Sequence, residues 1–190
     1  MNNYEYIIAC LPVLGEGRLS EGCASCIEGI REQLDERDRK TLDFVLGCYA
    51  PEGTNGDFYT AALASRNAFI REYFRFDLNV RNTKTEFLNS ALERPEGTDL
   101  VILEGNDGEF DEKAEVDAIL SQKDILARER GLDDIMWKKA EELTVLHVFD
   151  FDVILAFVVR LKIIERWELL DEQTGREMFR KLVEELRNNR

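Results

Sequence analysis

The sequence has few of the residues that interrupt helices or carry acid–base catalysis. Only three prolines occur in 190 residues, and none lies inside a long periodic segment. Because proline breaks the hydrogen-bond ladder of a helix, its scarcity favours a helical protein. There is a single histidine, His147, and no nucleophile elbow, zinc-protease helix, dinucleotide fingerprint or phosphate loop. The residues therefore predict no catalytic site, and we expect no enzymatic activity, no cofactor and no small-molecule substrate.

Positive charge is also scarce. Lys and Arg number 25 against 39 Asp and Glu, which gives a net charge of -14. Nucleic acids and anionic membranes both require a concentrated basic surface. We therefore expect no nucleic-acid partner and no direct insertion into lipid, whereas a basic protein partner would suit this charge.

No apolar run is long enough to cross a bilayer. The most apolar stretch, residues 143–164, has 16 apolar residues among 22, but its charge-free run over residues 153–159 is seven residues long. A spanning helix needs roughly 20. The apolar residues fall on every side of a helical wheel, so we predict a central buried helix over residues 143–164. Its β-branched residues leave a strand as the alternative. The N-terminus lacks the basic region of a signal peptide, so we expect a cytoplasmic protein.

Residues 57–92 contain neither proline nor glycine, and their apolar residues recur at steps of three, four and seven. This spacing predicts one long helix, roughly 50 Å at 1.5 Å per residue. The predicted fold class is therefore all-α, an irregular helical bundle with a long helix at about 57–92 and a central buried helix at about 143–164. We expect residues 1–190 to form a single domain, with a helical arm protruding around residues 75–130.

Shorter helices are predicted on both sides of these two. Ser20 can cap a helix to residue 34, and residues 35–49 form the next. Residues 111–130 have helical spacing, and we expect Gly131 to end that helix and Asp133 to cap a further one. Thr174 can cap a last helix near the C-terminus.

Cysteine spacing raises the question of a metal. Cys23 and Cys26 have the two-residue spacing of a zinc knuckle, and Cys10 and Cys48 could complete four ligands. Neither Cys10 nor Cys48 belongs to a second pair, and no histidine is near. Buried, reduced thiols on helix faces are the alternative, which we favour, so no metal site is predicted.

His147, Asp150 and Asp152 are the other polar residues in an apolar setting. On a helix, His147 and Asp150 share a face, while Asp152 points elsewhere. They could bind a metal or act as acid and base. The alternative, which we favour, is that the aspartates pair with an arginine or cap a helix, because a buried charge must be paired.

Three segments carry a family resemblance: residues 4–9 (YEYIIA), residues 71–82 (REYFRFDLNVRN) and residues 149–153 (FDFDV), the last leading into an apolar helix with Arg160 and Lys162. Residues 74–78 and 149–153 also resemble each other, which suggests two like helices. With these motifs the chain resembles the C/d family of central-stalk subunits in V-type and A-type ATPases, and more closely the short bacterial variant encoded beside such ATPases.

The resemblance implies a coupling subunit without an active site, in the central stalk of a rotary ATPase that transports protons or sodium ions. Its partners would be the membrane rotor ring and the central shaft, and it would be held at the cytoplasmic face of the membrane by the complex. In that role Asp150 and Asp152 would be structural. The alternative function is a stand-alone helical adaptor that binds another protein, using the long helix at 57–92 to grip a partner helix.

Overall fold

The computed structural model describes residues 4–15, 22–51, 53–104, 106 and 110–169. Within these residues the chain forms helices and no strand, which confirms the all-α prediction. The helices are α1 Tyr4–Ala9, α2 Cys23–Gln33, α3 Glu36–Gly47, α4 Gly56–Leu63, α5 Ala68–Ala91, α6 Lys113–Leu120, α7 Ile125–Glu142 and α8 Phe151–Leu169. The helix predicted from Thr174 lies outside the described residues.

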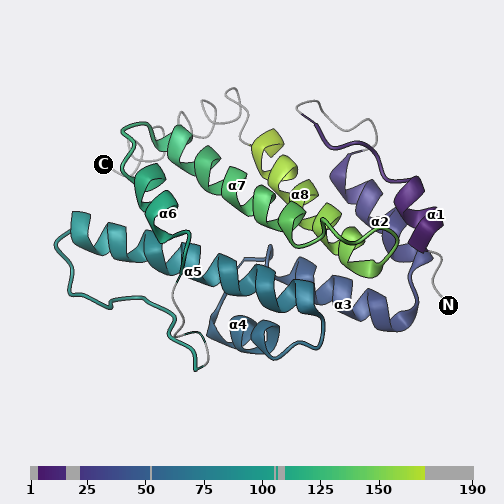
Figure 1. Cartoon of the computed structure of the whole chain (residues 1–190), viewed down its shortest axis with the longest axis horizontal. Coiled ribbons are helices and arrows are strands. Elements are labelled where there is room, and N and C mark those ends of the chain that lie inside the picture. Colours follow the sequence, from purple (N-terminus) through teal and green to yellow (C-terminus); the bar gives the residue numbers. More distant parts are fainter. Residues whose placement is uncertain (1–3, 16–21, 52, 105, 107–109, 170–190) are drawn as a thin grey trace, which may run out of the picture.

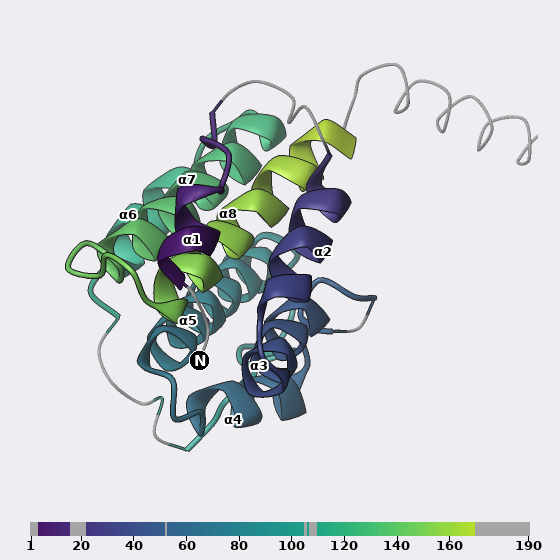
Figure 2. The ribbon, with the colours of Figure 1, turned by 90° about the vertical axis from the view of Figure 1, so that its right-hand side faces the viewer.

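Two helices organise the bundle. α5 runs along the molecule, with α4 on one side and α6, α7 and α8 on the other (Figure 1). α8 contacts α1, α2, α3, α5 and α7, and Figure 2 shows it between α7 and α2. Its side chains are almost wholly buried from Ile154 to Val159. No described helix is long and apolar enough to span a membrane.

The central helix begins later than predicted. Residues 143–150 form turns and bends, and α8 starts only at Phe151. Asp150 Oδ1 accepts hydrogen bonds from the backbone N–H groups of Asp152 (3.1 Å) and Val153 (3.3 Å). Such a side-chain cap satisfies the free N–H groups of a first helical turn. The prediction of one buried helix over residues 143–164 is therefore wrong for its first eight residues and correct for the remainder.

The predicted long helix over residues 57–92 is also wrong, because the chain breaks between α4 and α5. Asn67 caps α5 by accepting the Ile70 N–H at 2.8 Å, and Ser65 Oγ accepts the Asn67 N–H at 3.2 Å. The break folds α4 back onto α5, and the Phe58 and Phe74 rings meet edge to face with centroids 4.9 Å apart. Side chains that compete for backbone hydrogen bonds favour this turn over a continued helix.

Gly131 does not end a helix but lies inside α7. A Cβ built on it would lie 2.9 Å from Cγ2 of Ile119, a residue of α6. Glycine here allows close approach of the two helices, at the cost of backbone entropy. The predicted boundary at Gly131 is wrong, and Asp133 is a buried residue of α7 rather than a cap. The division into one domain with an arm at residues 75–130 stays a prediction.

Candidate functional site

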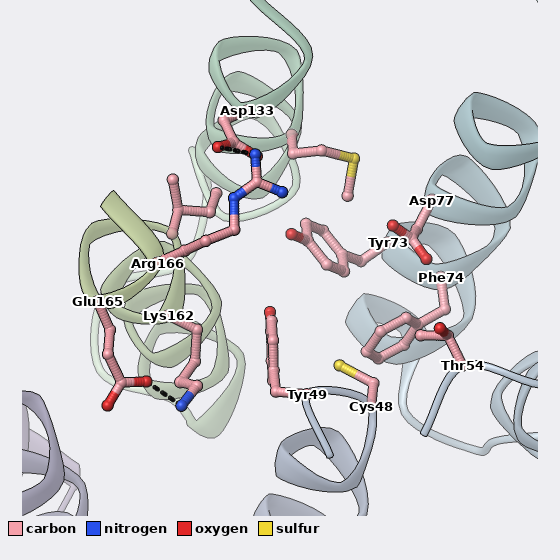
Figure 3. A pocket seen from close by; sticks show the side chains of 12 residues that line it. Cys48, Tyr49, Thr54, Tyr73, Phe74, Asp77, Asp133, Lys162, Glu165 and Arg166 are labelled. Atoms are coloured by element: carbon pink, nitrogen blue, oxygen red, sulfur yellow. Dashed lines mark hydrogen bonds and ion pairs between the residues drawn. The ribbon is translucent and has the colours of Figure 1, made fainter. Parts of the chain in front are cut away.

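A cavity of about 400 Å³ lies between the end of α3, α5, α7 and α8 (Figure 3). The four segments that form it are far apart in the sequence and meet only in the folded bundle. Its lining combines aromatic, apolar and charged side chains. It consists of Cys48, Tyr49, Thr54, Tyr73, Phe74, Asp77, Asp133, Met136, Lys162, Ile163, Glu165 and Arg166.

Both cations of the lining come from α8 and both are paired. Arg166 bonds Asp133 of α7 at 2.8 Å, and Asp133 also accepts the Trp167 indole N–H at 2.6 Å. Burial raises the pKa of Asp133, and the charge of Arg166 opposes that rise. Lys162 forms an ion pair with Glu165, one helical turn later on α8.

Asp77 of α5 differs from the other two carboxylates of the lining. It accepts a hydrogen bond from the Tyr59 hydroxyl at 2.5 Å. Among the described residues, no cation lies within ion-pair distance of it. Burial raises the pKa of Asp77, and the Tyr59 hydrogen bond and the charge of Arg81 only partly oppose this rise. A carboxylate without an ion partner is the least compensated charge in the cavity.

Two tyrosines and a cysteine complete the polar lining. Burial raises the pKa of Tyr49 and of Tyr73 well above the ordinary value, and that of Cys48 to about 12. All three groups are therefore protonated at neutral pH. A thiol with a raised pKa is a poor nucleophile, because the thiolate is the reactive form. These protonated groups are therefore suited to forming hydrogen bonds with a bound ligand rather than to nucleophilic attack.

The cysteines noted in the sequence do not form a cluster with other metal-binding residues. The described part of the chain contains no group of three or more His, Cys, Asp or Glu placed to hold a metal ion. Cys23 is buried, its thiol directed at the Leu161 carbonyl oxygen 3.9 Å away, and burial raises its pKa. Cys10 is exposed and Cys26 is half-buried. A raised thiol pKa disfavours the thiolate that zinc requires, which favours a buried thiol at Cys23. The exposed Cys10 does not fit the prediction of buried thiols.

His147, Asp150 and Asp152 are close in the chain but have local roles. His147 Nδ1 contacts the Asp150 carboxylate within the turn before α8, not on a helix as predicted. Asp150 caps α8, and Asp152 accepts a hydrogen bond from the Asn67 side chain. The two aspartates therefore stabilise the start of α8: Asp150 by capping its first turn, and Asp152 by a hydrogen bond to the α4–α5 connection.

A second feature is the exposed apolar segment between α7 and α8, which we call the α7–α8 loop (residues 145–149). Val145 is 77% exposed, Leu146 90%, Val148 65% and Phe149 53%. Sequence reasoning placed these residues in the core. Asp150 followed by Asp152 is the signal that could have placed residues 145–149 outside the helix. A capping aspartate with an acidic residue in the first turn marks a helix start.

Comparison with known protein families gives a match over the C-terminal part of the chain. A family described as "protein of unknown function (DUF2764)" matches residues 105–190, which include α6, α7 and α8. No curated protein and no solved structure matches the chain. The match is to this family and not to the C/d central-stalk subunits of V-type and A-type ATPases, so the resemblance to those subunits is wrong. The three segments that carried the resemblance are short patterns of aromatic residues and aspartates, and such patterns arise readily in unrelated helices.

Proposed function

We propose that this protein is a non-catalytic helical module that binds another protein through its α7–α8 loop. The observation that carries the proposal is the exposure of Val145, Leu146, Val148 and Phe149 within five consecutive residues. Single exposed apolar side chains are common on soluble proteins, whereas contiguous ones mark surfaces that are covered by a partner.

The loop is held in a defined conformation. The Thr144 hydroxyl donates to the Ala140 carbonyl at 2.9 Å, and the His147 N–H donates to the Thr144 carbonyl at 2.9 Å. Asp150 ties the end of the loop to α8. A segment already ordered before binding loses less entropy when a partner covers it, which raises affinity.

The surroundings of the loop suggest the chemistry of the partner. α1 packs against α8, the Tyr4 and Phe151 rings stack with centroids 6.0 Å apart, and Tyr6 on α1 is 59% exposed. The chain as a whole carries a charge of -14. We therefore expect a partner with an apolar patch flanked by basic residues, since complementary charge speeds encounter and fixes orientation.

The proposal replaces the mode of binding expected from the sequence. The single helix over residues 57–92, expected to grip a partner, is two helices, and the second half of α5 lies against α6, where Glu86 pairs with Lys113 (Figure 1). A role as a coupling subunit of a rotary ATPase, with the rotor ring and shaft as partners and a place at the membrane, depended on the overturned resemblance. It stays an untested prediction and forms no part of this proposal.

Photo-crosslinking tests the proposal. A benzoylphenylalanine at position 146 should capture a discrete protein in native cells, and mass spectrometry would identify it. With that partner purified, Leu146→Glu should raise the dissociation constant at least about tenfold, close to 1.4 kcal/mol. Ile102→Glu is the matched control, since Ile102 is 83% exposed and lies elsewhere. Equal affinity of both variants and the parent would contradict the proposal.

A further inference from the structure

The charges that line the cavity do not balance. Three carboxylates (Asp77, Asp133 and Glu165) face two cations (Lys162 and Arg166). Arg166 is paired with Asp133 and Lys162 with Glu165, so both cations are engaged. One negative charge, that of ionised Asp77, is left over within the lining.

The hydrogen bonds of Asp77 leave one of its oxygens available. The Tyr59 hydroxyl donates to Oδ2, and no described residue donates to Oδ1. Arg81, one helical turn further along α5, only partly compensates the charge of Asp77 and forms no ion pair with it. Its guanidinium instead lies 5.9 Å from the centroid of the Tyr59 ring and donates to the Thr54 carbonyl at 2.5 Å. The group that would complete the site is therefore a hydrogen-bond donor with positive charge.

The walls beside Asp77 are aromatic. Tyr49, Tyr73 and Phe74 line the same cavity, and Figure 3 shows the two tyrosine side chains between Arg166 and Lys162 on one side and Asp77 on the other. The Tyr49 ring already receives one cation, because Lys162 Nζ lies 5.5 Å from its centroid. Aromatic faces attract ammonium groups through the negative charge at the centre of the ring.

We propose that this cavity binds a small organic cation, an ammonium group on an apolar body, with Asp77 as its ion partner. A volume of about 400 Å³ lies within the range of pockets that enclose small ligands. The hydroxyl of Tyr49 is buried, but the residue as a whole is 39% exposed, so the lining reaches the molecular surface at this residue. An anion would find both cations of the lining already paired, and a neutral ligand would leave Asp77 without an ion partner. This site is separate from the α7–α8 loop and does not depend on the proposed function.

Three probes of the same shape and different charge test the proposal: 2-phenylethylammonium, 2-phenylethanol and phenylacetate. Isothermal titration calorimetry should show the ammonium binding at least about tenfold more tightly than the alcohol, with phenylacetate weakest. Chemical-shift changes in NMR spectra of the parent protein should centre on Tyr49, Tyr73 and Asp77. Equal binding of the three probes, no saturable binding of the ammonium at millimolar concentration, or shift changes centred elsewhere would each overturn the proposal.

Variants then assign the charge recognition to Asp77. Asp77→Asn should remove the preference for the ammonium over the alcohol, while Glu115→Gln, which changes an exposed carboxylate on α6, should keep it. Circular dichroism checks that both variants fold. If Asp77→Asn does not fold, the NMR map of the parent protein with the three probes decides the question. Preserved preference in a folded Asp77→Asn protein would overturn the assignment.

Discussion

Two short segments of similar sequence differ in their burial in this molecule. Residues 74–78 (FRFDL) lie in the middle of α5, and residues 149–153 (FDFDV) straddle the start of α8. Phe74 is 1% exposed, and Phe149, its counterpart, is 53% exposed. The aspartates differ as well: Asp77 faces the cavity, whereas Asp152 bonds the α4–α5 connection. Position relative to a helix start therefore decides whether the same residues form core or surface.

The comparison also separates the two functional proposals. The segment in α5 contributes Phe74 and Asp77 to a cavity enclosed by four parts of the chain. The segment at α8 contributes Phe149 to an open apolar surface. The first is suited to a small ligand, and the second to a macromolecular partner.

The largest effect is expected at Phe74. Phe74→Ala removes a ring that is 1% exposed and packs edge to face on Phe58 and Tyr73. We expect a loss of about 3–5 kcal/mol in the free energy of unfolding, the usual range for a buried phenylalanine. Urea denaturation followed by circular dichroism measures it. A loss below about 1 kcal/mol, typical of a surface position, would contradict its place in the core.

A smaller loss in the free energy of unfolding is expected from a substitution at Gly131, where α6 and α7 approach each other. Gly131→Ala places a methyl group 2.9 Å from Ile119 Cγ2, and overpacking of this kind costs about 1–3 kcal/mol. Alanine recovers up to about 1 kcal/mol of helix propensity, so a net loss of about 1 kcal/mol is expected in thermal or urea denaturation.

Gly29→Ala is the matched control. Gly29 lies inside α2, and an added Cβ meets nothing within 4 Å. With no clash, only the propensity gain remains, so we expect stabilisation of about 0.5–1 kcal/mol. Stabilisation by both substitutions would show that Gly131 is not needed for close packing.

Asp77 should make stability depend on pH. Its pKa is raised in the folded state, so its contribution to stability is fully present below the pKa of the unfolded chain, about 3.9. That contribution is lost as the pH rises through the folded value. Asn does not ionise, so the melting temperature of Asp77→Asn should improve relative to the parent as pH rises from about 4 to 7. A difference between the two proteins that does not change with pH would contradict the raised pKa.

The smallest effect is expected at Phe149. Phe149→Ala should change the free energy of unfolding by no more than about 0.5 kcal/mol, because the ring is largely exposed. The same urea experiment as for Phe74 measures it and completes the comparison. A loss approaching that of Phe74→Ala would place Phe149 in the core and remove the main support for a docking loop.

Part of the fold and little of the site could be predicted from sequence. The absence of proline from periodic segments indicated helices, and the apolar run over residues 153–159 indicated a buried one; both depend on local composition. The α7–α8 loop was misassigned because composition does not show where a helix begins, and the Asp150 cap was not recognised. The cavity was missed entirely, since Cys48, Asp77, Asp133 and Lys162 come from four segments and share no local pattern.

The sequence by itself determined the helical class, the burial of residues 154–159 and the acidic charge. These follow from side-chain propensity, hydrophobicity and ionisation, which each residue carries with it. Only the tertiary structure decided how α4 packs back onto α5, the place of Gly131 inside α7 and the leftover charge at Asp77. Each of these depends on a contact between residues distant in the chain: Phe58 with Phe74, Ile119 with Gly131, and Asp133 with Arg166. Such contacts exist only after the helices have packed.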